Sequence, residues 1–416
     1  MVGSANNSSN LGDECMWEAA AGIVRAQYPD LEIVTDGQHP SEWDVPVSNV
    51  TVHPFLYPAL QRGERFFPGR GNQSIPHKLV SRPFRIRTAQ KILEKELAGE
   101  STSSLAREWE ELIAHSKGLV FTGAGAITDD YAIHGVYSWR LLTEYAVRHN
   151  VPIAFLGQGV GPLAHPLLRA NASAMLNLAE VVRVRERPSL AVVQSLGVGH
   201  AQVEGDWALL LTPTDTDRQT AVKALRATGI DGRFLAISLH KRANFRSRQM
   251  EEYASLVSSL HARAETRGLK LLFVPNMTRG RYSDDRATAR DILDRSGLGP
   301  SSMRILETPL SAASTKALLG LADSVITSRY HPLIFAMSEG VPTIGASLDE
   351  YYDQKLEGAS SQFGVHGNVA RVAELIDDLD SRVASLESIR PQPISVERTK
   401  SMLDGLLGFL DRALQL

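Results

Sequence analysis

The chain has 416 residues, of which 43% are hydrophobic and 22% are charged, and its formal net charge is −3. This length exceeds what one hydrophobic core usually supports and predicts two domains, whereas the charge gives no support to nucleic acid or an anionic membrane surface as the main partner. A single cysteine, Cys15, excludes an intrachain disulfide and any multi-cysteine metal site.

Short apolar runs alternate with helix-like segments through the first half of the chain. The predicted strands are Leu31–Thr35, Leu119–Thr122, Ile153–Leu156 and Val181–Val184, and the predicted helices span 13–28, 103–116, 136–149, 166–178 and 187–196. After the first strand, residues 54–85 are rich in Pro, Gly and Arg and have no clear periodicity. An insertion of this length is usually either functional or mobile.

The second half repeats the alternation. Its predicted strands are Phe234–Leu239, Leu269–Val274, Arg304–Leu306, Ser324–Thr327 and Val341–Gly345, and its predicted helices span 216–228, 249–267, 284–296, 311–321, 332–339 and 368–385. The polar stretch 212–220 is predicted to be the linker, and the apolar spacing of 395–416 predicts a terminal helix. We therefore expect an α/β protein with parallel sheets, divided into domains 1–212 and 213–394 and the terminal helix 395–416.

Neither a secretory signal nor a membrane span is expected from the sequence. Residues 1–14 have neither the basic nor the apolar region of a secretory signal, and no apolar run reaches the ~18 residues of a membrane span. We therefore predict a cytoplasmic protein without a transmembrane segment, which remains compatible with peripheral contact with a lipid-linked substrate.

Polar, glycine-rich segments follow several predicted strands. They are GAGAITDD at 123–130, GQGVGPL at 157–163 and the Arg329-Tyr330-His331 cluster, while NLGDE at 10–14 opens the first helix. Two α/β halves bind ligands at the carboxyl ends of their strands, so we expect the site in the cleft between the domains. Glycine in these segments lets a ligand approach the main chain closely.

Each segment also has a purely structural interpretation. A Gly-x-Gly turn is common packing chemistry, and Asp13 alone is equally well explained as a helix N-cap. Arg329 alone is compatible with an ordinary ion pair, and His331 alone with a cap of the helix that Pro332 opens. Together, however, a helix N-terminus, a bidentate cation and a titratable ring favour an anion-binding site.

Segments spread over residues 10–358 resemble the polysaccharide pyruvyl transferase family. They are NLGDE at 10–14, GAGAITDD at 123–130, GQGVGPL at 157–163, RVRERPS at 183–189, GDWALLL at 205–211, TSRYHPLIFAMSEGVPTIG at 327–345 and YYDQK at 351–355. The resemblance implies two Rossmann-like domains in a GT-B-like arrangement. It also implies transfer of the enolpyruvyl-derived group of phosphoenolpyruvate to sugar hydroxyls, usually as a pyruvate ketal.

The resemblance also assigns donor-site residues. The family's S-x-R-x-H motif falls on Thr327, Arg329 and His331, which would hold the carboxylate and phosphate of phosphoenolpyruvate. Lys355 corresponds to a second phosphate ligand, and Arg185 to the arginine of an R-D-x-x-S motif.

Five positions depart from the family pattern. Thr327 replaces serine, Tyr330 replaces an apolar residue, Ala124 interrupts a triple glycine and Glu186 replaces aspartate. Pro332 follows the histidine, which we expect to bias His331 away from helical geometry. None of these changes removes a cationic ligand, so the expectation of donor binding is kept.

Ketal formation needs an acid for the methylene carbon of the donor and a base for the sugar hydroxyl. His331 and Asp13 are the expected pair, with their two roles left open, and Asp129 and Asp130 are the runners-up. The arginines and the lysine supply the charge that the departing phosphate requires. No histidine–carboxylate group has metal-ligand spacing, so we expect neither a metal nor a cofactor.

The saccharide acceptor is expected on the first half of the chain. Candidate contacts are Asn10, Asp129, Asp130, Arg70 and Tyr131, beside the aromatic residues Phe55, Tyr57, Phe66, Phe67 and His134. An equally good interpretation is that Phe66 and Phe67 only fix the insertion to its domain. Two rival functions stay open: a GT-B glycosyltransferase with a nucleotide-sugar donor, and a catalytically silent sugar-binding or scaffold protein.

Overall fold

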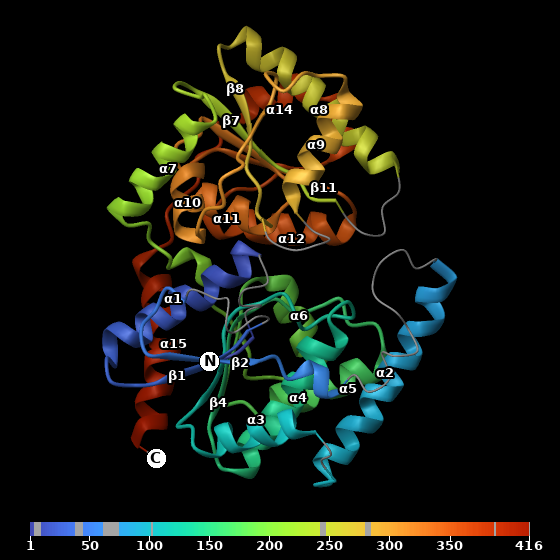
Figure 1. Ribbon diagram of the computed structural model, residues 1–416, viewed down its shortest axis with the longest axis vertical. Coiled ribbons are helices and arrows are strands. Elements are labelled where there is room, and N and C mark those ends of the chain that lie inside the picture. Colours follow the sequence, from blue (N-terminus) through green and yellow to red (C-terminus); the bar gives the residue numbers. More distant parts are fainter. Residues whose placement is uncertain are drawn as a thin grey trace. The chain divides into compact units, whose positions relative to one another are not determined.

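The structure is a computed structural model that describes residues 1–3, 10–37, 45–60, 75–100, 103–241, 247–278, 284–386 and 388–415. The chain divides into two compact units. The first unit consists of Met1–Asn7, Met16–Trp207 and Lys400–Leu416, and the second consists of Ser8–Cys15 and Ala208–Thr399. Both units are layered from parallel sheets and helices (Figure 1).

The main sheet of the first unit has four parallel strands in the order β3 (Leu119–Phe121), β4 (Ile153–Gln158), β5 (Val181–Val184) and β6 (Gln202–Val203). A separate parallel pair consists of β1 (Ile33–Gly37) and β2 (Val50–Pro54). Val2 pairs with Phe121, so the start of the chain lies beside β3. The helices are α1 (Leu11–Gln27), α2 (Ile75–Leu97), α3 (Ser104–Ala114), α4 (Trp139–Arg148), α5 (Pro166–Asn177), α6 (Arg187–Ser195) and α15 (Val396–Gln415), with a π-helical stretch η4 (Ala132–Ser138) and short 3-10 helices η2 (Tyr57–Leu60) and η5 (Trp207–Leu209).

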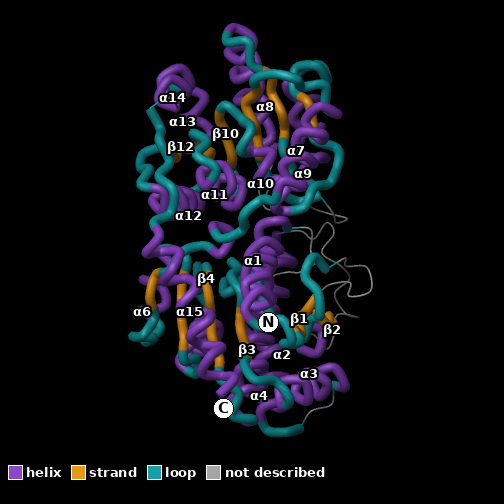
Figure 2. Tube along the Cα trace, turned by 90° about the vertical axis from the view of Figure 1, so that its left-hand side faces the viewer, coloured by secondary structure: helices purple, strands orange, loops and turns teal. Residues whose placement is uncertain are grey.

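The second unit contains one parallel sheet of six strands in the order β12 (Val369–Arg371), β11 (Thr343–Ser347), β10 (Ser324–Thr327), β7 (Phe234–Ser238), β8 (Lys270–Phe273) and β9 (Arg304–Ile305). The four inner strands are almost entirely buried, as expected for a parallel sheet covered on both faces (Figure 2). Its helices are α7 (Asp215–Ala227), α8 (Ser247–Thr266), α9 (Asp285–Ser296), α10 (Ala312–Leu319), α11 (Tyr330–Ser338), α12 (Glu350–Ser360), α13 (Val372–Asp377) and α14 (Leu379–Leu386), with the 3-10 helix η6 (Ser361–Phe363).

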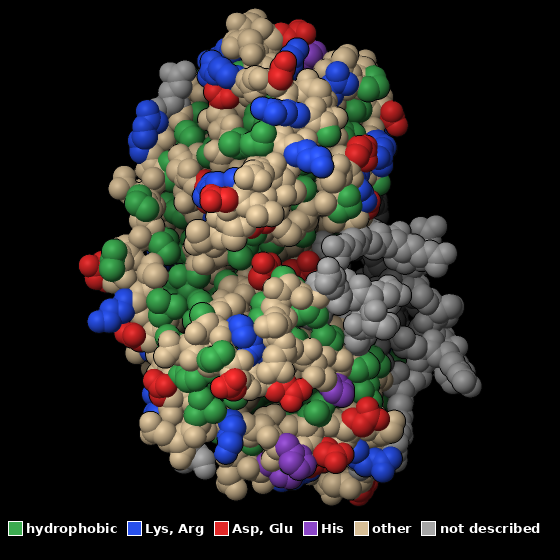
Figure 3. All heavy atoms as spheres, turned by 60° about the vertical axis from the view of Figure 1, so that its left-hand side comes forward, with side chains coloured by type: hydrophobic (Ala, Val, Ile, Leu, Met, Phe, Trp, Pro, Cys, Tyr) green, Lys and Arg blue, Asp and Glu red, His purple; other side chains and the backbone are tan. Residues whose placement is uncertain are grey.

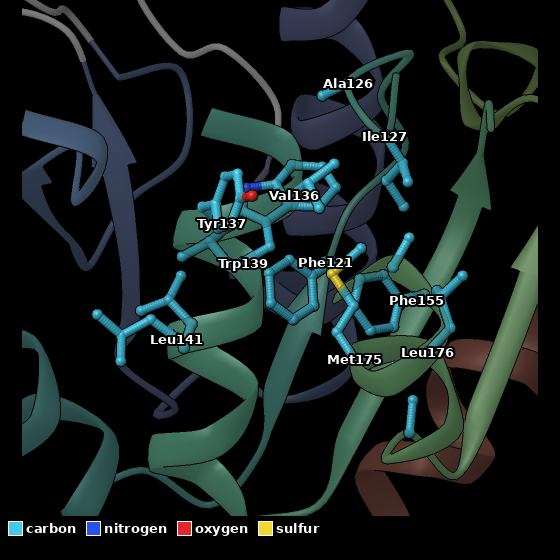
Figure 4. Close-up of a cluster of buried hydrophobic side chains, with 14 of the residues drawn as sticks. Phe121, Ala126, Ile127, Val136, Tyr137, Trp139, Leu141, Phe155, Met175 and Leu176 are labelled. Carbon is cyan, nitrogen blue, oxygen red and sulfur yellow. The ribbon is translucent and has the colours of Figure 1, made fainter. Parts of the chain in front are cut away.

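Aromatic side chains fill the core of the first unit between β3, β4 and α4 (Figure 4). The rings of Phe121 and Phe155, on neighbouring strands, stack with their centroids 4.2 Å apart and an interplanar angle of 3°. Trp139, the first residue of α4, packs on Phe121 at 5.1 Å. All three side chains are completely buried, so truncation of either phenylalanine to alanine should cost about 3–5 kcal/mol.

The predicted α/β class with parallel sheets is confirmed, and most predicted elements are present within a few residues. The prediction missed β2, β6 and β12, as well as α2 and α12. β6 and β12 are edge strands of two and three residues, too short to show a periodic pattern. The segment predicted as one helix over 368–385 instead contains β12, α13 and α14.

The predicted linker at 212–220 is wrong, because most of it belongs to the start of α7. The Thr214 hydroxyl accepts a hydrogen bond from the backbone N–H of Asp217 at 3.2 Å, and the Asp217 carboxylate accepts one from the backbone N–H of Thr214 at 3.0 Å. This capping box explains why a polar stretch starts a helix here.

The units also differ from the predicted division of the chain. The first unit ends at Trp207 instead of residue 212, and α15 packs with the first unit from Lys400 onward. Residues 10–15 group with the second unit, to which Asn10 is bonded.

No helix in the described ranges is both long and apolar enough to span a membrane. On the face drawn in Figure 3, acidic and basic side chains are interspersed with uncharged ones, without an extended area of one charge.

Candidate active site

The segment after β10 is held in place by the hydroxyl groups of Thr327 and Ser328. Thr327 Oγ1 donates to the carbonyl of Ser238 at 2.8 Å and accepts from the backbone N–H of Arg329 at 2.9 Å. Ser328 Oγ accepts from the backbone N–H of His240 at 3.0 Å. Thr327, predicted as a substrate ligand, is fully buried and orients the backbone of Arg329.

Arg329 forms the N-cap of α11, with extended backbone angles, and its guanidinium group is oriented by Asp285. Nη2 of Arg329 is paired with Oδ1 of Asp285, whose side chain is only 3% exposed. The other carboxylate oxygen of Asp285 accepts from the backbone N–H groups of Asn276 at 3.0 Å and Met277 at 2.9 Å. Nε of Arg329 is buried and has no hydrogen-bond partner within the described part of the chain. The guanidinium therefore keeps a donor for a ligand.

Asn10 and Asp13 join this arrangement from the start of α1. The backbone N–H of Leu11 donates to the carbonyl of Asn276 at 3.2 Å, and Nδ2 of Asn276 donates to Oδ1 of Asn10 at 3.0 Å. Nδ2 of Asn10 in turn donates to Oδ2 of Asp13 at 2.6 Å. A continuous polar chain therefore runs through Arg329, Asp285, Asn276, Asn10 and Asp13, all in the second unit.

Gly12 places His331 directly against the start of α1. A Cβ atom at Gly12 would lie 1.8 Å from Nδ1 of His331 and 2.0 Å from its Cγ, so only glycine fits beside the ring. The imidazole is almost buried and also packs edge-on against Tyr330, with centroids 5.2 Å apart. The ring of His331 therefore lies against Gly12, the residue before Asp13.

Neither His331 nor Asp13 is an N-cap. Arg329 has that position in α11, so His331 lies in the first helical turn. The expected bias of His331 away from helical geometry is wrong, because Pro332 also falls in that turn, where a missing N–H costs no intrahelical hydrogen bond. In α1, Oδ1 of Asn10 accepts from the backbone N–H of Gly12 at 3.3 Å, and Asn10 provides the capping interaction.

Lys355 lies among three tyrosine rings. Its Nζ is 5.5 Å from the ring centroid of Tyr330, 5.7 Å from that of Tyr351 and 5.9 Å from that of Tyr352. Cation–π attraction of this kind stabilises the charged ammonium. Tyr330, a departure from the family pattern, thus contacts a predicted phosphate ligand. The Tyr352 hydroxyl is 2.9 Å from Nε2 of His240.

Arg185 belongs to a buried network in the first unit. Its Nε donates to Glu186 at 2.8 Å, and Nη1 lies 3.6 Å from a carboxylate oxygen of Asp206. Ser189 donates to Glu186 and accepts from the backbone N–H of Val160 at 2.9 Å. The R-x-x-x-S positions therefore connect β5 to the loop after β4. Arg185 is only 3% exposed and already faces two carboxylates.

The predicted acceptor residues differ in their hydrogen bonds and in their exposure. Asp129 accepts from the backbone N–H groups of Ala164 at 2.9 Å and His165 at 3.4 Å, which fixes a turn. Tyr131 is 55% exposed at the start of η4. Asp130 lies beside it at the surface, and Arg70 lies outside the described residues.

The aromatic residues at the border of the insertion pack with each other. The His134 ring lies 5.1 Å from that of Phe55 and 5.7 Å from that of Tyr57. Burial lowers the pKa of His134 to about 4, so its imidazole is neutral. This cluster is part of the packing of the first unit.

A family model for polysaccharide pyruvyl transferases matches residues 10–350, most of the chain. The chain belongs to the polysaccharide pyruvyl transferase family. The match contains Asn10, Asp13, Arg185, Arg329 and His331 and ends five residues before Lys355. Membership indicates a transferase of polysaccharide biosynthesis.

Solved structures of low sequence identity share the fold. A putative UDP-N-acetylglucosamine 2-epimerase from Listeria monocytogenes has a TM-score of 0.60 at 12% identity, covering 99% of this chain and 96% of that one. The UDP-GlcNAc 2-epimerase of Methanocaldococcus jannaschii has a TM-score of 0.59 at 10% identity, covering 96% of both chains. The GT-B-like fold is therefore confirmed. No curated protein matches the chain significantly.

Sequence reasoning missed two members of the polar chain in this family member, Asp285 and Asn276. Asn276 follows β8 closely, so the rule that ligands bind at carboxyl ends of strands would have found it. Asp285 follows the N-cap Asp284 of α9 and resembles ordinary capping chemistry. Within the described ranges, no group of three or more His, Cys, Asp and Glu side chains could hold a metal ion.

Proposed function

We propose that the protein transfers the pyruvyl group of phosphoenolpyruvate to two hydroxyl groups of a saccharide, giving a pyruvate ketal and inorganic phosphate. One observation carries the proposal. Beyond the carboxyl end of β10, a buried donor of Arg329 belongs to the polar chain that includes Asp13, and the ring of His331 lies against Gly12, the residue before Asp13. The residues that would bind an anion and transfer protons therefore lie near one strand end.

The chemistry follows from the donor. A proton is added to the methylene carbon, which leaves an oxocarbenium-like centre at the carbon that carries the phosphate. One sugar hydroxyl adds to this centre and gives up its proton. A second hydroxyl then displaces the phosphate, which leaves with the remaining proton. Two proton transfers and one departing dianion therefore need protein groups.

The residues present supply those groups. Arg329 binds the carboxylate or phosphate of the donor, and Lys355, held among its tyrosines, adds charge for the phosphate. His331 and Asp13 transfer the protons. We leave Arg185 out of the donor site, since Glu186 and Asp206 already face it. The scheme uses no metal and no cofactor.

The test is an incubation with phosphoenolpyruvate and a panel of glycans or lipid-linked saccharides, in which inorganic phosphate and ketal product are measured. We expect phosphate release that requires both substrates and persists after exhaustive chelation. Release of nucleotide from a UDP-sugar, without turnover of phosphoenolpyruvate, would contradict the proposal and favour a glycosyltransferase. A divalent-ion requirement would contradict the metal-free scheme.

A further inference from the structure

The roles of His331 and Asp13 depend on how the carboxylate of Asp13 is held. Nδ2 of Asn10 donates to Oδ2 of Asp13 at 2.6 Å. A carboxylate that accepts such a bond is favoured in its charged form. An ionised carboxylate can take a proton and cannot give one. The direction of the Asn10 amide therefore bears on whether Asp13 is the acid or the base.

The Asn10 amide has only one orientation that satisfies its neighbours. The backbone N–H of Gly12 points at Asn10 Oδ1 at 3.3 Å, and a backbone N–H is always a donor. Rotating the amide by 180° would place an NH₂ group against this donor and an oxygen against the carboxylate of Asp13. The oxygen must therefore face Gly12, and the NH₂ group must face Asp13.

Asn276, in the loop after β8, completes this orientation. Its side chain is 2% exposed, and its Nδ2 donates to Oδ1 of Asn10 at 3.0 Å. With Asn10 fixed by Gly12, Asn276 must present its NH₂ group and not its oxygen. Its backbone is held as well, because its N–H donates to Asp285 and its carbonyl accepts from Leu11.

We propose that Asn276 is a positioning residue that acts through Asn10 to hold Asp13 as a carboxylate, so that Asp13 is the base that takes the proton of the sugar hydroxyl. His331 is then the acid that protonates the methylene carbon. This inference rests on the proposed function and assigns the roles within it. At the other end of this hydrogen-bonded series, Asp285 is paired with Arg329, the proposed ligand of the donor.

The experiment compares wild type, Asn276→Ala and Asn276→Asp with a matched control, Asn368→Ala. Asn368 is another buried asparagine of the second unit, whose Nδ2 donates to the carbonyl of Thr343 at 2.9 Å, away from the polar chain. The measurements are kcat for phosphate release against pH, the Kd of phosphoenolpyruvate by calorimetry, and Tm.

Both Asn276 variants should lower kcat at least 10-fold while the Kd of phosphoenolpyruvate changes less than twofold. Their acidic limb of kcat should move to higher pH, because the base loses support for its charged form. Asn368→Ala should lower Tm and leave both the limb and kcat unchanged. In the background of Asn10→Ala, adding Asn276→Ala should not move the limb further, since Asn276 acts through Asn10.

An unmoved acidic limb in Asn276→Ala, with only Tm reduced, would overturn the inference and leave the proposed function standing. If the alkaline limb of kcat against pH moves instead, Asp13 is the acid and His331 is the base. The Asn10 side-chain amide, followed by ¹⁵N NMR, needs no turnover, and its signal should shift in Asn276→Ala and stay unchanged in Asn368→Ala. A wild type that releases no phosphate would therefore contradict the proposed function, while this measurement still decides whether Asn276 positions Asn10.

Discussion

Replacing Gly12 by alanine should separate His331 from the start of α1. The added Cβ would lie 1.8 Å from Nδ1 of His331, whereas real Cβ contacts shorter than 3.0 Å essentially never occur. The difference, 3.0 − 1.8 = 1.2 Å, is the least distance by which the ring or the helix start must move. Whichever moves, the geometry between His331 and Asp13 changes.

A displacement of this size is large for catalysis. A misplacement of about 1 Å can cost about 100-fold in rate, so kcat of Gly12→Ala should fall at least about 100-fold. Overpacking of a buried contact costs about 1–3 kcal/mol of stability, which is less than the about 5–15 kcal/mol of a typical domain. The variant should therefore still fold, and phosphate release with chemical unfolding will show both effects.

Gly22 provides the control on the same helix. A Cβ at Gly22 meets no atom within 4 Å. Gly22→Ala should therefore leave kcat unchanged and stabilise α1 by about 0.5–1 kcal/mol. Normal turnover by Gly12→Ala would refute the reasoning, because it would mean that proton transfer does not depend on the contact between residue 12 and the His331 ring.

Three further predictions follow from the same structure. Arg329→Lys should weaken phosphoenolpyruvate binding in calorimetry by about 1.5–3 kcal/mol despite the retained charge, because the fork of donors is lost; unchanged affinity would end the assignment. Asp285→Asn should lower the free energy of unfolding in urea by about 1.5–3 kcal/mol. Asp284→Asn keeps the N-cap of α9 and weakens only the partly exposed ion pair with Arg286, so it should cost less, about 0–1 kcal/mol. Burial raises the pKa of Glu204 from 4.5 to about 8, so the native state loses stability as pH rises between these values, by at most about 1.4 kcal/mol per pH unit. Glu204→Gln should remove that loss between pH 5 and pH 8, and equal slopes for both proteins would show that Glu204 is ionised throughout.

The sequence predicted the fold where a single physical signal dominates. Inner strands such as β4 and β7 contain continuous apolar runs, since both faces of a parallel sheet are covered. Edge strands of two or three residues carry no such signal, and the capping box of α7 has the composition of a turn. Both kinds of error come from reading composition without the hydrogen bonds that the backbone finally makes.

The residues of the candidate site were predictable from sequence only where they carry a local signal. Arg329 and His331 stand out because charged and titratable groups directly follow a buried strand. Asn276 and Asp285 are distant in sequence from the residues they hold, and each has an ordinary local explanation. Their contribution depends on which atoms they meet across the unit, and a sequence does not contain that information without the fold.

Neither unit is a continuous stretch of the chain, which has a consequence for dissecting the protein. A cut at Trp207 would give an N-terminal fragment that carries Asn10 and Asp13 but lacks the second unit to which they are bonded. The C-terminal fragment would keep Arg329 and His331 without those partners, and would carry α15 away from the first unit. Each fragment expressed alone should therefore lack part of its unit. We expect the protein to reassemble only when both fragments are expressed together.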